Sequence, residues 1–237
     1  MSRYFIGVDV GGTKTTALVA DVEGNVAGIG AARGGNPRSS GAETAEVVAA
    51  AAAEALGGID PSRVAHGVVA VAGGVAGRSA EEQPILRAWS RAGLSAPVTF
   101  VPDVLAAFRA GTPARRGAVL VAGTGAVAAV VDGDAVVRRA GGHGWLVGDE
   151  GSAVWLGIRG VRAVLHALDG RGPATSLTTA FVEAIGIDAD ADPEALARAL
   201  VDHVYAHPPA DLGRLARPVV DACAAGDAVA SELVRDA

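Results

Sequence analysis

The sequence predicts an α/β protein built from two similar halves, and three observations support this. An apolar strand, a glycine-rich turn and a second apolar strand open the first half at residues 4–21. The same arrangement returns at residues 118–131. After residue 151 the hydrophobic pattern is almost entirely helical. The repeated unit indicates an internal duplication with a ligand bound in the cleft between the two halves.

The first half alternates strand and helix patterns. Residues 64–71 form a continuous apolar run, as expected for a strand that is buried on both faces. Residues 41–56 are alanine-rich and favour a helix. The expected elements are strands at 4–10, 15–21, 26–33, 64–71 and 98–101, and helices at 41–56, 82–92 and 104–110. Gly111-Thr112-Pro113 stops the last helix, so we expect one domain over 1–112 and a second over 113–237.

The second half begins with strands and ends with helices. Asp192-Pro193-Glu194 is a typical helix start, with a capping carboxylate before proline. The expected elements are strands at 118–122, 127–131 and 136–139, and helices at 153–168, 174–185, 193–206 and from 215 to the end. This half has few strands, and its last helix has no stop signal. We therefore expect the second domain to be incomplete and the natural chain to continue.

Composition excludes several classes of function. The formal net charge is −6, which disfavours nonspecific nucleic-acid binding through phosphate contacts. A single cysteine, Cys223, rules out an intrachain disulfide and a cysteine cluster for zinc or iron–sulfur. The sequence lacks a signal-peptide pattern and an uninterrupted apolar run of ~18 residues. We expect a cytoplasmic protein without nucleic-acid or membrane partners.

The first glycine-rich turn carries the clearest chemical signal. Asp9 stands near the end of the first strand, and Gly11 to Lys14 form the turn; Lys14 is the only lysine in the chain. Backbone N–H groups in such a turn bind phosphate oxygens, and a neighbouring carboxylate orients Mg²⁺. P-loops and dinucleotide fingerprints open a helix, whereas the apolar run Thr15–Ala20 predicts a strand. An ordinary hairpin without a ligand is the alternative.

Four segments together resemble a known family. They are Asp9-Val-Gly-Gly-Thr-Lys-Thr, Pro102-Asp103-Val-Leu-Ala-Ala, Ala122-Gly-Thr-Gly and Gly141-Gly-His-Gly-Trp-Leu-Val-Gly-Asp-Glu-Gly-Ser152. In order and spacing the chain resembles the N-acetylglucosamine kinase group, or BadF/BadG/BcrA/BcrD-type ATPase family, of the actin-like ATPase and sugar kinase superfamily. The resemblance implies a duplicated ribonuclease H-like (actin-like ATPase) fold, with a cleft between two domains.

The resemblance also implies roles for individual residues. Asp103 would be the catalytic general base that takes the proton from the sugar hydroxyl, and Asp9 would hold Mg²⁺ through water. The phosphates of ATP would contact Gly11, Gly12, Thr13, Lys14, Gly123, Thr124 and Gly125. The sugar would contact Asn36, Asp103, Gly142, His143 and Asp149. An adenosine-binding Gly-Gly segment would follow in a later strand–helix unit, beyond residue 237.

Three of these residues have ordinary structural alternatives. Asp103 could cap the helix that follows it, and Asp149 could cap the helix near Ser152. Asn36 precedes a proline, and Asn-Pro is a common turn dipeptide. Two positions depart from the family pattern: His143 stands where tryptophan is common, and Ala126 where a serine usually follows Gly-Thr-Gly.

The implied function is ATP-dependent phosphorylation of an amino sugar, N-acetylglucosamine or glucosamine, at the 6-hydroxyl. The implied partners are the sugar, ATP and Mg²⁺, and a homodimer is left open. One alternative is a non-catalytic switch that binds nucleotide or sugar. Another is an ATPase that activates a dehydratase, but such activators share an iron–sulfur cluster held by cysteines, and Cys223 alone supplies too few ligands.

Overall fold

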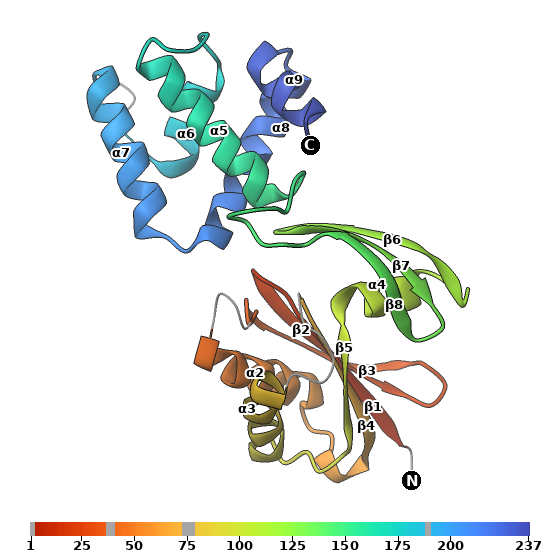
Figure 1. Ribbon diagram of the computed structural model, residues 1–237. Coiled ribbons are helices and arrows are strands. Elements are labelled where there is room, and N and C mark those ends of the chain that lie inside the picture. Colours follow the sequence, from red (N-terminus) through yellow and green to blue (C-terminus); the bar gives the residue numbers. More distant parts are fainter. Residues whose placement is uncertain (1–2, 37–40, 73–78, 188–190) are drawn as a thin grey trace. The chain divides into compact units, whose positions relative to one another are not determined.

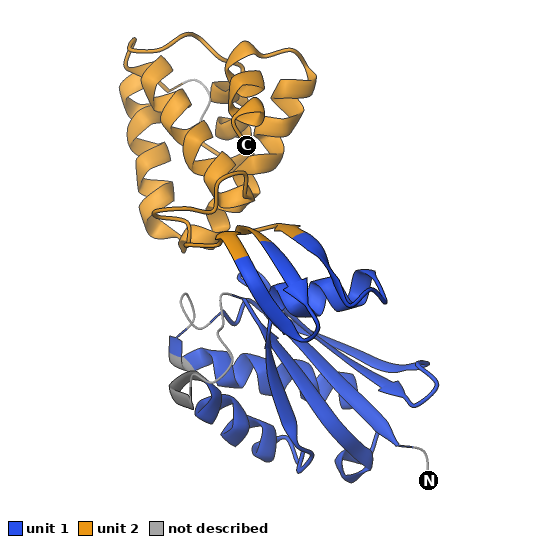
Figure 2. Cartoon of the chain, turned by 45° about the vertical axis from the view of Figure 1, so that its right-hand side comes forward, with its two compact units in different colours: residues 1–119, 129–138 blue, residues 120–128, 139–237 orange. Residues whose placement is uncertain are grey.

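The structure is a computed structural model that describes residues 3–36, 41–72, 79–187 and 191–237 (Figure 1). The chain forms two compact units, shown in blue and orange in Figure 2. Unit 1 contains residues 1–119 and 129–138, and unit 2 contains residues 120–128 and 139–237. The domain division expected after residue 112 stays a prediction. Within the described ranges, no helix is long and apolar enough to cross a membrane.

Unit 1 contains a five-stranded mixed sheet. Its strands are β1 (Tyr4–Val10), β2 (Lys14–Asp21), β3 (Val26–Arg33), β4 (Val64–Val71) and β5 (Val98–Pro102), in the order β3-β2-β1-β4-β5. β1, β4 and β5 run parallel, whereas β1–β2 and β2–β3 are antiparallel. The five strands expected in the first half are confirmed. The parallel pairing brings the carboxyl ends of β1, β4 and β5 to one edge of the sheet.

Helices α2 (Thr44–Leu56) and α3 (Ser79–Arg91) cover one face of this sheet (Figure 1). The short helices η1 (Gly41–Glu43) and η2 (Pro61–Arg63) precede α2 and β4, and α4 (Asp103–Gly111) follows β5 and packs in a separate cluster. Alternate residues of β1, namely Ile6, Val8 and Val10, are at most 2% exposed and pack in one core with Val48 and Trp89. This alternation is the signature of a strand with one covered face.

A second sheet links the two units. It consists of β6 (Arg116–Ala122), β7 (Ala126–Asp132) and β8 (Ala135–Gly141), in the order β6-β7-β8. Each strand begins in one unit and ends in the other. In unit 1, Leu105 and Phe108 of α4 pack against Val131 of β7. A Cβ on Gly117 would lie 2.8 Å from the Phe108 ring, so glycine lets the helix approach β6 closely.

The rest of unit 2 is helical. Its helices are α5 (Ala153–Leu168), α6 (Leu177–Ile185), α7 (Pro193–Ala206), η3 (Pro209–Leu215), α8 (Ala216–Ala224) and α9 (Ala228–Arg235). They share a core that includes Val154, Leu177, Phe181, Val219 and Ala230. The helix start predicted at Asp192 is confirmed, since its side chain accepts a hydrogen bond from the N–H of Ala195 (2.9 Å).

The prediction of one helix from residue 215 to the end is wrong, because the chain breaks between α8 and α9. Gly226 takes a φ of +92°, which residues with a side chain rarely adopt. Asp227 then caps α9 by accepting from the N–H of Ala230 (2.9 Å). Its other oxygen accepts from the Ser176 N–H (2.7 Å) and from the hydroxyls of Ser176 and Thr175 (both 2.9 Å). One carboxylate therefore joins two segments that are far apart in sequence.

We expect Asp227→Ala to lower the free energy of unfolding by roughly 2–3 kcal/mol, because it removes a helix cap and three further hydrogen bonds. Burial acts to raise the pKa of Asp227, but these hydrogen bonds outweigh it and the pKa is lowered. The stabilisation is therefore present above the ordinary aspartate pKa and is lost as the pH falls through the lowered value. Denaturant unfolding at neutral and acid pH measures this. Asp221→Ala is the control, since the Asp221 side chain pairs, within the described ranges, only with the exposed Arg217.

Candidate active site

The first glycine turn connects β1 to β2 in unit 1. The N–H of Gly11 donates to the carbonyl of Lys14 (3.0 Å), which closes the turn. A Cβ on Gly11 would lie 2.8 Å from that same carbonyl oxygen, so the tight turn needs glycine here. Asp9 is the next-to-last residue of β1 and lies on the opposite face from the buried Val8 and Val10. The turn and the carboxylate are thus adjacent, as predicted.

The loop after β3 packs against this turn. The N–H of Gly35 donates to the carbonyl of Gly11 (3.1 Å). A Cβ on Gly34 would overlap the carbonyl of Gly12, so only glycine allows the two backbones to come this close. The loop therefore holds the half-buried Asn36 beside the glycine turn. The Gly34-Gly35 pair was a visible sequence signal for this close approach, but its packing partner was not predictable.

Asp103 reaches the same region from the other side of β4. Strand register pairs Val10 of β1 with Val71 of β4, and Val71 with Pro102 of β5. Asp103 follows Pro102 directly and is the first residue of α4. The helix N-cap position belongs to Pro102. The capping alternative, which places Asp103 at that position, is therefore wrong. Asp103 is half-buried.

The two carboxylates interact electrostatically. Partial burial and the negative charge of Asp103 both raise the pKa of Asp9. A divalent cation would relieve this repulsion, so the pair fits the Mg²⁺ expected at Asp9. In the described part of the chain, no three histidine, cysteine or acidic side chains gather as a metal site. Such a cation would therefore complete its coordination with water and phosphate oxygens, as Mg²⁺ commonly does.

The second glycine turn joins β6 to β7 in unit 2. The N–H of Gly123 donates to the carbonyl of Gly125 (2.9 Å). The first residue of α5, Ala153, donates its N–H to the carbonyl of Gly123 (2.9 Å), and Val154 donates to Thr124 (3.4 Å). N–H groups of a first helical turn lack partners inside the helix, so these bonds tie the start of α5 to the turn.

Asp149 is the most constrained side chain beside this second turn. It is 9% exposed and has a φ of +57°. Its Oδ1 accepts a hydrogen bond from the N–H of Gly144 (3.0 Å). A Cβ on Gly125 would lie 2.7 Å from its Oδ2, so the missing side chain makes room for the carboxylate. Ser152, rather than Asp149, caps α5 by accepting from the Trp155 N–H (3.1 Å).

The loop between β8 and Asp149 contains the remaining amino acids that are predicted to contact the sugar. Gly142 has a φ of +69°, and its N–H donates to the carbonyl of Ala126 (2.8 Å). His143 is exposed and lies against Gly148, where a Cβ would come within 2.8 Å of the histidine Cβ. Trp145 is 45% exposed. Sequence reasoning had assigned no role to Trp145 or to Ser152, although a serine before an apolar run was a recognisable cap signal.

The structure thus gathers the predicted site residues into two sets. Unit 1 brings together Asp9, Gly11, Gly12, Thr13, Lys14, Asn36 and Asp103. Unit 2 brings together Gly123, Thr124, Gly125, Gly142, His143 and Asp149. The sequence profile of the BadF/BadG/BcrA/BcrD ATPase family matches residues 6–237, which include both sets.

The chain belongs to the BadF/BadG/BcrA/BcrD ATPase family. This member is 30% identical to the N-acetyl-D-glucosamine kinase of Dictyostelium discoideum over 202 residues, which cover 80% of the chain and 63% of the relative. It is 25% identical to the N-acetylmuramic acid/N-acetylglucosamine kinase of Clostridium acetobutylicum, over a match that covers 99% of the chain and 76% of the relative. The chain thus spans less than two thirds of the first relative and about three quarters of the second.

A solved structure supports the same assignment. A protein of Chromobacterium violaceum, described as a candidate N-acetylglucosamine kinase, superposes with a TM-score of 0.77 at 27% identity, covering 99% of this family member and 79% of its own chain. The α/β, actin-like ATPase and sugar kinase fold expected from the sequence is therefore confirmed.

Removing the charge of Asp9 should change stability in a pH-dependent way. Its pKa is raised in the folded state, so the folded state gains stability as the pH falls through the raised value and the charged form destabilises it at neutral pH. We expect Asp9→Asn to raise the melting temperature of this ATPase-family chain near pH 7, and the gain to vanish near pH 4. Thermal denaturation with and without Mg²⁺ measures this. The cation should stabilise the wild type and leave Asp9→Asn unaffected; equal stabilisation of both would place the cation elsewhere.

The second turn allows a matched pair of substitutions. Gly125→Ala places a Cβ 2.7 Å from Asp149 Oδ2, whereas a Cβ on Gly123 meets nothing within 4 Å. Overpacking against a buried carboxylate should cost about 1–3 kcal/mol of unfolding free energy in Gly125→Ala. Gly123→Ala should cost less than about 1 kcal/mol. Denaturant titration of both variants compares them, and equal losses would show that Asp149 moves aside freely.

Proposed function

We propose that the protein to which this chain belongs is an ATP-dependent kinase that phosphorylates a hydroxyl of an amino sugar. The observation that carries the proposal is the pair of interacting carboxylates, Asp9 and Asp103, beside the Gly11–Lys14 turn. One carboxylate beside a phosphate-binding turn binds a metal ion, and a second accepts the proton of the attacking hydroxyl. Phosphoryl transfer needs both groups, because its catalysis consists mainly of positioning and charge stabilisation.

The relatives support the choice of acceptor. Those from Dictyostelium and Clostridium are both named as N-acetylglucosamine kinases, and the second also as an N-acetylmuramic acid kinase. We propose N-acetylglucosamine or glucosamine as the substrate and the 6-hydroxyl, which is primary and the least hindered, as the acceptor. Asn36 and Asp103 in unit 1, and His143 and Asp149 in unit 2, are the proposed sugar contacts.

In the proposed reaction, Asp103 accepts the proton of the sugar hydroxyl as that oxygen attacks the γ-phosphorus of ATP. The new oxygen–phosphorus bond forms while the bond from the γ-phosphorus to the β–γ bridging oxygen breaks. ADP carries away the electron pair, and the sugar phosphate forms. Phosphate oxygens are held by N–H groups of the two glycine turns other than those of Gly11 and Gly123, which donate within their own turns. When Mg²⁺ is bound at Asp9, it neutralises charge that develops on the phosphates.

The surroundings of Asp103 suit this role. Its half-burial limits competing water, and its position at a strand end leaves the carboxylate at the sheet edge beside Asp9. We also propose that the natural domains divide near residue 112, with one phosphate turn in each. The second domain would then be partial in this chain, as its coverage of the relatives suggests.

Asp103→Asn should lower kcat by roughly 10²- to 10⁴-fold, because it removes the general base while keeping the side-chain shape. KM for ATP and for the sugar should change little, since Asn still forms hydrogen bonds. The measurement is ADP release by the full-length protein across N-acetylglucosamine, glucosamine, N-acetylmuramic acid and glucose.

A wild-type protein that hydrolyses ATP without phosphorylating any of these sugars would contradict the kinase proposal. Undiminished turnover in Asp103→Asn would remove Asp103 as the base. Phosphorus NMR of the product identifies the hydroxyl that is phosphorylated, and a 6-deoxy sugar that still accepts phosphate would exclude the 6-position.

A further inference from the structure

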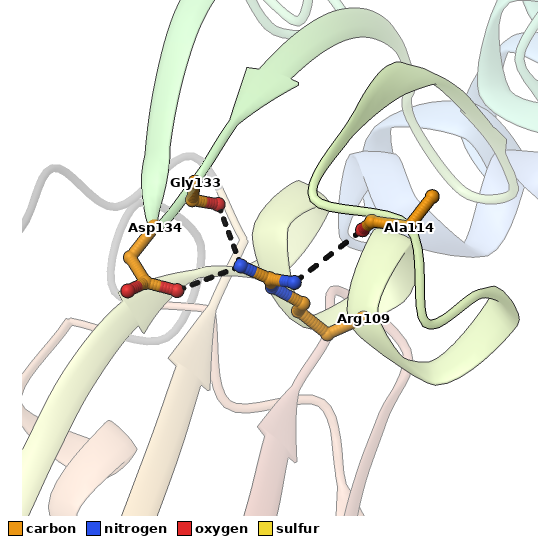
Figure 3. Close-up of polar contacts among 4 residues, drawn as sticks. All are labelled: Arg109, Ala114, Gly133 and Asp134. Atoms are coloured by element: carbon orange, nitrogen blue, oxygen red, sulfur yellow. Dashed lines mark hydrogen bonds and ion pairs between the residues drawn. The ribbon is translucent and has the colours of Figure 1, made fainter.

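Arg109, in the last turn of α4, makes contacts that the proposed function leaves unexplained. Its Nη2 donates to the carbonyl of Gly133 (2.8 Å) and to Oδ1 of Asp134 (2.8 Å), in the hairpin between β7 and β8. Its Nη1 donates to the carbonyl of Ala114, in the loop before β6 (3.4 Å). One guanidinium thus joins α4 to two loops at the same end of the three-stranded sheet (Figure 3).

The carbonyl bonds are the important part of this arrangement. The Asp134 side chain is 88% exposed, so its ion pair with Arg109 is screened and contributes little. The Arg109 side chain is 33% exposed, and its bond to Gly133 is partly buried. Two carbonyl oxygens in different loops need two donors in a fixed fork, which arginine supplies and lysine does not.

The same helix carries Asp103 at its other end. Asp103 and Arg109 are six positions apart, which is about 9 Å along a helix. Between them, Leu105 and Phe108 pack against Val131 of β7. The hydrophobic effect itself is not directional. The fork of Arg109 adds a directional tie between the C-terminal end of α4 and the sheet.

The strands that Arg109 holds lead to the second phosphate turn. β6 ends at Ala122 and β7 starts at Ala126, so their other ends flank Gly123–Gly125. Within unit 1, α4 and Arg109 therefore connect Asp103 to the hairpin between β7 and β8. A small displacement of a catalytic group can cost about 100-fold in rate.

We propose that Arg109 is a positioning residue for phosphoryl transfer, which sets the axial position of α4 and so of the Asp103 carboxylate. This proposal rests on the proposed function. It predicts that loss of the fork impairs the chemical step more than substrate binding, because the phosphate contacts and the sugar contacts other than Asp103 lie outside α4.

The test compares three variants of the full-length protein. Arg109→Met keeps the length and apolar stem of the side chain but removes its donors, and we expect kcat to fall roughly 10- to 100-fold. KM for ATP and for the sugar should stay within about threefold, because every proposed binding group except Asp103 lies outside α4. Arg109→Lys should recover only part of kcat, since one ammonium cannot reproduce the fork.

Arg116→Met is the matched control. Arg116 lies on β6 and, among the described residues, pairs with Asp132 alone, at 3.8 Å and with 76% of its side chain exposed. Its kcat should match the wild type. If Arg109→Met matches Arg116→Met in kcat well below its melting temperature, the proposal is overturned, even if Arg109→Met melts earlier. If Arg109→Met does not fold, Arg109→Lys decides by the same comparison.

Hydrogen exchange separates failure of this proposal from failure of the proposed function. The amides of residues 103–111 should exchange faster in Arg109→Met than in Arg116→Met, in protein without ligands. A wild type without sugar kinase activity refutes the proposed function, and this comparison still decides whether Arg109 holds α4. Equal exchange rates in the two variants would overturn the positioning role.

Discussion

Parallel pairing of β1, β4 and β5 is the constraint on which the rest of the site depends. Because the strands run in one direction, the residues that follow them emerge at one edge of the sheet. Asp9 and Asp103 come within electrostatic range only through this pairing, across the intervening β4. Partial burial and the charge of Asp103 both raise the pKa of Asp9, so its charged form disfavours the folded state at neutral pH. A bound cation would offset it, so the same feature links stability to ligand binding.

Close backbone approach is the second recurring constraint. The absence of a side chain at Gly34 lets one loop reach the first turn, and its absence at Gly125 makes room for Asp149 beside the second. In both places a polar group or backbone carbonyl occupies the space that a Cβ would fill. Neighbouring segments thus support both turns. Such support keeps the N–H groups of a phosphate-binding turn preorganised for the phosphate.

Polar side chains supply the long-range ties that apolar packing leaves undetermined. Asp227 joins the segment before α6 to the start of α9 with four hydrogen bonds. Arg109 joins α4 to two loops at the end of the three-stranded sheet. In each case one charged group satisfies several backbone partners, and its direction fixes how neighbouring elements align.

The sequence by itself determined the local structure and the family. The strand at 64–71, the turn at Gly11–Lys14 and the helix start at Asp192 followed from periodicity, glycine and capping chemistry, which act over a few residues. The break at Gly226 was missed because the alanines before and after Gly226-Asp227 continue the helical pattern, although glycine followed by aspartate is a local stop and start signal. Tertiary structure alone decided that Asp9 and Asp103 lie within electrostatic range, that Asp149 lies against Gly125, and that Arg109 contacts two loops. These contacts depend on strand order and on backbone distances between remote segments, which no local pattern encodes.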